Sequence, residues 1–177
     1  MFISVKHIER GGLRVERLVK PHTVTDADGR VIPFEPAALE GMVEPRQEGF
    51  RFRGRVSAVG TFECSRCLEP YRHALEADFD LFYSAAPPEG AGLEDSEAKL
   101  DAASLAPLQD ERIDLTALVS EQINLNLPLK PLCKPGCLGL CAGCGTNRNL
   151  GPCGCEHEAG GSSPDRPLTA GSRSGGH

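Results

Sequence analysis

The stretch that decides the fold is FRFRGRVSAVGTFECSRCLEPYRHALEADFDLFY, residues 50–83. Apolar or small residues occupy every second position over residues 50–62, with three arginines among the residues between them. The same period returns over residues 71–83, where acidic residues fill several of the alternate positions. A period of two indicates a β-strand with one buried face. We therefore predict two consecutive strands joined by the segment that contains Cys64 and Cys67.

A two-residue turn at Ser65 and Arg66 would place Cys64 opposite Cys67 and fix the register of an antiparallel hairpin. On the apolar face this register gives the pairs Val56 with Leu75, Phe52 with Phe79 and Phe50 with Leu81. On the other face it gives the pairs Arg55 with Glu76, Arg53 with Asp78 and Arg51 with Asp80. Because the facing acids cancel much of the charge of the arginines, the arginine stripe is a weak candidate for RNA contact.

The flanking sequence completes an α+β fold. Asp114 is a suitable N-cap for a helix over residues 115–127, whose apolar side chains follow helical spacing until Pro128. Edge strands are expected at residues 2–5 and 13–19, and a short turn of helix or a loop at residues 33–40. We therefore predict an antiparallel β-sheet core with a long hairpin, a covering C-terminal helix and a Cys-rich C-terminal module that binds zinc.

Composition divides the 177 residues into three parts. Residues 1–132 form the α+β domain, interrupted at about 84–112 by an acidic stretch that is poor in large apolar side chains and is expected to be a flexible loop. Residues 133–157 form the Cys-rich module. Residues 158–177 are rich in Gly, Ser, Pro and Arg, and we expect a disordered tail. The core that remains is small enough for a structural metal to help to hold it.

All eight cysteines fall into three short groups. They are Cys64 with Cys67, then Cys133, Cys137, Cys141 and Cys144, then Cys153 with Cys155. Thiolates at such spacings can converge on one zinc ion in a tetrahedral site, so eight could hold two ions. We predict one or two zinc ions. In the partition that we favour, the first pair joins Cys133 and Cys137, and the other four form a compact ribbon in which His157 could replace Cys155.

The N-terminus carries charges where a signal peptide needs an apolar run, and no stretch approaches 18 apolar residues, so a cytoplasmic location without membrane contact is expected. Because cysteines are kept reduced in the cytoplasm, they are expected to bind metal there and not to form disulfides.

Two alternatives to zinc remain open. A redox Cys-x-x-Cys usually opens a helix, but a strand follows Cys67. The spacing of Cys137, Cys141 and Cys144 also suits an iron-sulfur cluster. A thiol/disulfide redox protein and an iron-sulfur protein are therefore the alternatives.

No catalytic constellation emerges from the remaining residues. His7, His22, His73 and His157 are scattered along the chain, and no glycine-rich phosphate loop follows a strand. We expect no enzymatic activity and no small-molecule substrate.

Three segments carry a resemblance to a known family. Residues 63–71, 113–133 and 137–149 are similar in order and spacing to the YceD family. The likeness covers residues 50–155, and the N-terminal segment more loosely. This family is implicated in the accumulation of large-subunit ribosomal RNA in bacteria and plastids, and in many bacteria it is encoded beside a large-subunit protein. The resemblance therefore implies a non-enzymatic role in ribosome biogenesis. Its partner would be large-subunit ribosomal RNA or an early large-subunit protein.

The distal cysteines vary among members of that family. Leu138 and Ala142 also stand where a basic residue and a proline are common. Whether a distal metal is essential is therefore open.

Charge restricts where RNA could bind. The net charge of -6 argues against indiscriminate binding to phosphates. Four basic residues nevertheless surround the cysteine groups: Arg66, Lys130, Lys134 and Arg148. A rigid metal-bound knuckle could present them to RNA. The alternative is that they only solubilise a cysteine-rich tip.

Overall fold

A computed structural model describes residues 1–6, 8–26, 28–47, 49–84, 105–108 and 110–155. Five strands form the main sheet in the order β2-β5-β6-β7-β8. They are β2 (Leu13–Val19), β5 (Ala37–Arg46), β6 (Gly49–Glu63), β7 (Pro70–Ser84) and β8 (Leu105–Pro107). The first four pair antiparallel with their neighbours, whereas β8 runs parallel to β7. The described residues thus form a mostly antiparallel β-structure with one helix, in agreement with the predicted class.

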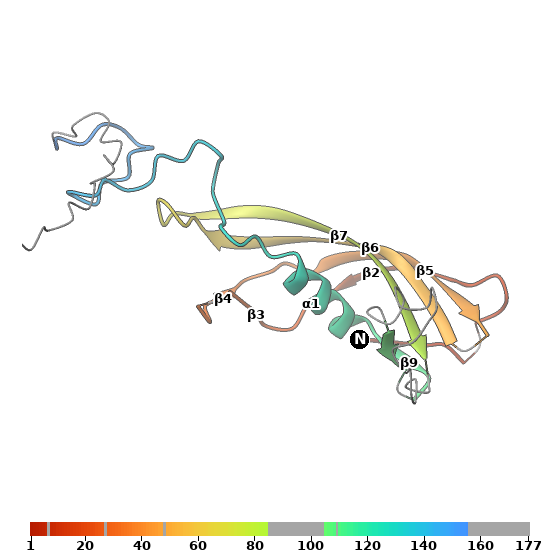
Figure 1. Ribbon diagram of the computed structural model, residues 1–177. Coiled ribbons are helices and arrows are strands. Elements are labelled where there is room, and N and C mark those ends of the chain that lie inside the picture. Colours follow the sequence, from red (N-terminus) through yellow and green to blue (C-terminus); the bar gives the residue numbers. More distant parts are fainter. Residues whose placement is uncertain (7, 27, 48, 85–104, 109, 156–177) are drawn as a thin grey trace, which may run out of the picture.

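Two small sheets and the helix complete the architecture. β1 (Phe2–Ser4) pairs with β9 (Arg112–Asp114), and β3 (Val24–Thr25) pairs with β4 (Val31–Ile32). The helix α1 (Leu115–Leu125) lies along one face of the main sheet (Figure 1). After α1 the chain runs to the end of the β6–β7 ribbon that carries residues 64–69 (Figure 1). Among the described residues, no helix is both long and apolar enough to cross a membrane.

The core lies between the sheet and α1. Leu115, Val119 and Ile123 of the helix are buried in one cluster with Phe52 of β6 and Phe79 of β7. The two rings meet edge to face, with centroids 5.1 Å apart. Burial of apolar side chains at this interface supplies the main driving force for folding.

The start of α1 is as predicted. Asp114 Oδ1 accepts hydrogen bonds from the N–H groups of Thr116 (2.9 Å) and Ala117 (3.3 Å). The helix ends at Leu125 with Asn126 as its C-cap, two residues before the predicted end.

The predicted register of β6 against β7 is wrong by two residues. Glu63 pairs with Pro70, so the connection is the six-residue loop 64–69 and not a two-residue turn. Val56 consequently faces Ala77 instead of Leu75, and Phe52 faces Leu81 instead of Phe79. The physical reason lies in the loop, where backbone hydrogen bonds stabilise a six-residue connection in place of a two-residue turn. Since the shift is an even number, each strand keeps its predicted buried face.

Other parts of the prediction also need correction. Residues 33–40 are not a turn of helix, because Ala37 begins the ten-residue strand β5 and Phe34 forms a β-bridge with Gly60. β8 and β9 lie within or at the end of the segment expected as a flexible acidic loop. Most of that segment, the tail 158–177, His7 and His157 lie outside the described residues.

The face of the sheet opposite α1 is charged and largely neutralised. Arg51 donates two hydrogen bonds to Asp80 (2.8 and 2.6 Å), and Arg55 donates two to Asp78 (2.6 and 3.1 Å). Arg53 lies 3.4 Å from Glu44. The arginines lower the pKa values of Asp78 and Asp80 through these hydrogen bonds. The arginine stripe is therefore occupied by internal ion pairs.

Candidate metal centres

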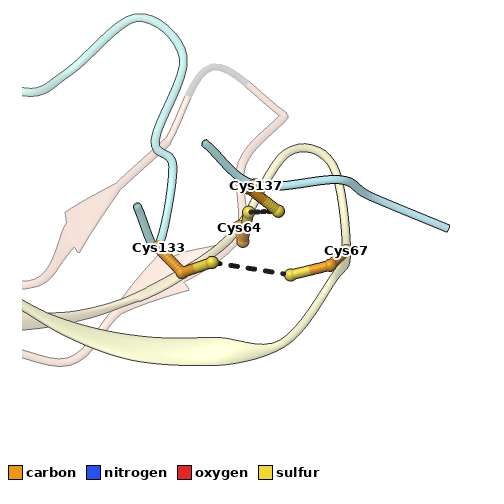
Figure 2. A group of neighbouring side chains, drawn as sticks. All are labelled: Cys64, Cys67, Cys133 and Cys137. Carbon is orange, nitrogen blue, oxygen red and sulfur yellow. Dashed lines mark hydrogen bonds between the residues drawn. The ribbon is translucent and has the colours of Figure 1, made fainter. Parts of the chain in front are cut away.

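The structure gathers four sulfurs at the end of the β6–β7 ribbon. Cys64 and Cys67 come from the 64–69 loop, and Cys133 and Cys137 come from the segment after α1 (Figure 2). We call these four residues the proximal cluster. In the loop, Cys64 N–H donates to Glu69 O (3.0 Å), and Leu68 N–H donates to Cys64 O (2.9 Å). This backbone turn points both sulfurs toward the C-terminal segment.

The spacing of these sulfurs fits one metal ion. Cys64 Sγ lies 3.7 Å from Cys137 Sγ, and Cys67 Sγ lies 3.7 Å from Cys133 Sγ (Figure 2). A tetrahedral zinc site with bonds of about 2.3 Å separates its sulfurs by about 3.8 Å. A disulfide would bring them to about 2.05 Å. Cys64, Cys67 and Cys137 are buried, as is usual for a closed structural site.

The other four cysteines form a second group. Cys141, Cys144, Cys153 and Cys155 offer sulfurs that all lie within 4.8 Å of one another, and we call them the distal cluster. Cys141 is buried, Cys144 is exposed, and the last two are half-buried. Cys141 N–H donates to Thr146 O (2.8 Å), and Gly145 N–H donates to Cys141 O (2.8 Å), which closes the first half of this group. The two groups of four are those of the predicted partition.

The protonation states within each cluster differ. Burial raises the pKa of the Cys64 thiol, but backbone N–H groups around its sulfur outweigh this effect and lower the pKa to about 6. Burial and the neighbouring sulfurs raise the pKa of Cys133 to about 12. In the distal cluster, hydrogen bonds from Thr146 lower the pKa of Cys144 to about 6, and the sulfurs around Cys155 raise its pKa to about 12. Four adjacent thiolates repel one another, so a bound cation is what would allow all of them to ionise.

Hydrogen bonds also join the C-terminal segment to the loop without any metal. Ser65 N–H donates to Pro131 O (2.8 Å), and Leu140 N–H donates to Arg66 O (3.1 Å). The Arg66 guanidinium donates to Cys137 O (2.9 Å). Gly139 has a φ of +71°, and a Cβ there would lie 3.0 Å from Arg66 O. Only glycine adopts this conformation without strain, so Gly139 permits the close approach of the two segments.

The four predicted basic residues are all exposed. They are Arg66, Lys130, Lys134 and Arg148. Within the part of the chain that the structure describes, none of the four forms an ion pair, in contrast to the arginines of β6. The loop that contains Arg66 is hydrogen-bonded to the segment between Lys134 and Arg148.

Sequence reasoning missed two residues of the site. Thr146 contacts a distal sulfur, and Asn149 contacts a proximal sulfur. The only signal was the polar run 146–149 between two cysteine pairs, and its contacts depend on the tertiary structure.

Comparison with known proteins gives related sequences and no solved structure that matches. A Mycobacterium tuberculosis protein described as uncharacterized is 31% identical over 145 residues, which cover 78% of this chain and 67% of that protein. A Zea mays protein described as "Large ribosomal RNA subunit accumulation protein YCED homolog 1, chloroplastic" is 30% identical over 147 residues, which cover 70% of this chain and 50% of that protein.

An Arabidopsis thaliana protein with the same description is 24% identical over 176 residues, which cover 88% of this chain and 52% of that protein. The chain thus spans about half the length of the two plant proteins. The sequence profile described as "Large ribosomal RNA subunit accumulation protein YceD" matches residues 52–166, more than half of the chain. The chain therefore belongs to the YceD family.

Proposed function

We propose that this protein is a non-enzymatic ribosome biogenesis factor. It supports the accumulation of large-subunit ribosomal RNA by binding that RNA or an early large-subunit assembly particle, in the cytoplasm. The observation that carries the proposal is membership of a family described by large ribosomal RNA subunit accumulation, a description that the two plant relatives share.

We call the 64–69 loop and residues 130–155 the tip. Zinc in both cysteine clusters would make this tip rigid. When bound, zinc would neutralise the thiolates and link residues 133–157, as a metal-binding module, to the domain formed by residues 1–132. The sulfur separations of 3.7 Å in the proximal cluster support this assignment. The protein's own residues orient the ligands: the 64–69 loop aims two sulfurs, and Arg66 holds the backbone carbonyl of Cys137.

The basic residues of the tip are the proposed RNA contacts. The arginines of the sheet already bind Asp78 and Asp80, whereas Arg66, Lys130, Lys134 and Arg148 have no acidic partner among the described residues. Cations that form no internal ion pair can neutralise phosphates and release counterions. The net charge of -6 would disfavour RNA binding elsewhere on the protein, so these basic residues are the favoured site of contact.

A charge reversal tests this assignment. The variant Lys134→Glu with Arg148→Glu should bind large-subunit ribosomal RNA more weakly, and the slope of log K against log salt should fall by about two, one for each lost phosphate contact. The matched control is Arg17→Glu with Lys20→Glu on or beside β2, also exposed and outside any ion pair of the described residues. Equal affinity of the tip variant and the wild type, at equal metal content, would reject the tip as the RNA contact.

Native mass spectrometry tests the metal assignment and its alternatives. Two zinc ions, or one, would support the proposal, and a brown preparation with iron would favour an iron-sulfur protein. A thiol/disulfide redox protein would show a fast-reacting thiol in the metal-loaded state, whereas a structural zinc site predicts slow alkylation until a chelator is added.

A further inference from the structure

The turn formed by residues 146–149 contacts both cysteine clusters. Thr146 Oγ1 lies 3.2 Å from Cys144 Sγ of the distal cluster in a hydrogen bond. At the other end of the turn, Asn149 Nδ2 donates to Cys137 Sγ of the proximal cluster (3.3 Å). A single short segment is therefore bonded to one ligand sulfur of each cluster.

Internal hydrogen bonds make this turn a stiff connection. The side chain of Asn147 accepts from Asn149 Nδ2 (2.8 Å) and from the Asn149 backbone N–H (3.0 Å). Asn149 Oδ1 in turn accepts from the N–H of Leu138, the residue after Cys137 (3.0 Å). A β-bridge between Leu140 and Asn147 holds the base of the turn. Displacement of one end of the turn would therefore displace the other.

A hydrogen-bond partner of a metal ligand orients that ligand, and loss of such a partner typically weakens metal binding. A distal ion would fix Cys141 and Cys144, and these residues hold the Thr146 end of the turn through the Cys141 N–H and the Cys144 sulfur. The fixed turn would then hold the Asn149 amide against Cys137 before the proximal ion binds. The ordering entropy of the turn is lost once, when the first ion binds, and not again for the second.

We propose that the two metal centres are thermodynamically coupled through residues 146–149, with Asn149 as the positioning residue, so that an ion in either cluster raises the affinity of the other. This inference rests on the proposed metal binding, and it adds that the occupancy of one cluster regulates the metal affinity of the other. Since Cys144 is exposed and Cys64 is fully buried, the distal ion is the one that exchanges with solvent. The distal site would thereby control how firmly the proximal site is closed.

Zinc affinities measured by chelator competition test the coupling. Asn149→Ala should weaken the proximal site about tenfold, the lower end of the range for residues that orient metal ligands. Asn124→Ala is the matched control, because Asn124 is an exposed asparagine of α1 away from both clusters. Cys144→Ser with Cys155→Ser should weaken the proximal site by the same factor by which Cys64→Ser with Cys67→Ser weakens the distal site, since coupling is reciprocal.

In the Asn149→Ala background both factors should approach one. Two results would overturn the proposal. One is a proximal affinity within twofold of the wild type after loss of the distal ligands. The other is a weakening of the proximal site, on loss of the distal ligands, that is the same in the Asn149→Ala background as in the wild type.

Cadmium-113 NMR of the intact chain covers the case in which a cysteine variant fails to fold. Loading of the distal cluster should shift the resonance of the proximal cadmium in the wild type, and Asn149→Ala should abolish that shift. An unshifted wild-type resonance would overturn the proposal. RNA binding is measured separately, so a failure of coupling with intact RNA binding leaves the proposed function standing.

Discussion

Replacement of Gly139 by alanine probes the contact that seats the C-terminal segment on the β6–β7 loop. Gly139 and Gly145 have nearly the same φ, +71° and +73°, but a Cβ at Gly145 would meet nothing within 4 Å. The left-handed conformation costs alanine about 1–2 kcal/mol at either position. At Gly139 the new Cβ would also press on Arg66 O, which accepts the Leu140 N–H. Loss of that hydrogen bond adds about 1 kcal/mol.

The expected losses are therefore about 1–2 kcal/mol for Gly145→Ala and about 2–3 kcal/mol for Gly139→Ala. Because metal binding includes the energy of closing the site, competition with a zinc chelator measures these losses. Total zinc affinity should fall about 5- to 30-fold in Gly145→Ala, and about fivefold further in Gly139→Ala, since 1.4 kcal/mol is tenfold. The reasoning is refuted by a Gly139→Ala protein that binds zinc as tightly as Gly145→Ala.

Three further predictions address the core, the sheet face and the cysteines. Phe52→Ala should lower the free energy of unfolding, measured in urea, by about 3–5 kcal/mol, because the Phe52 side chain is 0% exposed. Leu18→Ala should lower it by less than about 0.5 kcal/mol, because Leu18 is 69% exposed. Similar losses in the two variants would contradict the assigned core.

Arg51→Ala with Arg55→Ala should flatten the loss of stability on acidification of the chelator-treated protein. These arginines lower the pKa values of their carboxylate partners, so the stabilisation is present above the ordinary value of 3.8 and is lost as pH falls below it; thermal melts from pH 6 to 2 with unchanged slope would argue against the pairs. After a chelator is added, the thiols should become reactive in two phases, with the distal cluster first because Cys144 is exposed, and release of both clusters in a single phase would speak against this order.

Alternation of apolar residues was sufficient to predict the strands β6 and β7 and their buried faces, but not their register. A two-residue shift leaves the same side chains on each face, so the pattern cannot distinguish the two pairings. The choice is made in the loop, where Cys64 N–H bonds to Glu69 O and widens the turn to six residues. Such a bond has no periodic signal in the sequence.

β5 was missed for a different reason. Pro36, Gly41 and Pro45 resemble strand breakers, and they concealed the buried residues Ala37 and Leu39 that share one face of this strand. Gly41 faces Gly54 on β6, and a Cβ at Gly54 would lie 2.9 Å from the Phe79 ring, so these glycines make room for aromatic packing. That requirement is visible only when the strands are paired.

Cysteine spacing predicted which sulfurs meet, because turn-forming residues between close cysteines restrict where the sulfurs can point. The roles of Thr146 and Asn149 could not be predicted in the same way. Their partners are sulfur atoms whose positions are set by the 64–69 loop and by the fold of the distal cluster. Metal ligands can be identified in a sequence by their residue type and spacing, whereas residues that orient the ligands can be identified only from their contacts in the folded structure.

The pairing of β1 with β9 has a consequence for folding during translation. β2, β5, β6 and β7 each bond to the next strand of the main sheet, so this part can assemble while the ribosome is still adding residues. β1 has to wait for residues 112–114, and Cys64 has to wait for Cys137, 73 positions later. A nascent chain halted between these points would expose an uncovered apolar sheet and two unligated thiols. The proximal cluster can thus form only in a polypeptide whose main sheet and helix have been fully synthesised.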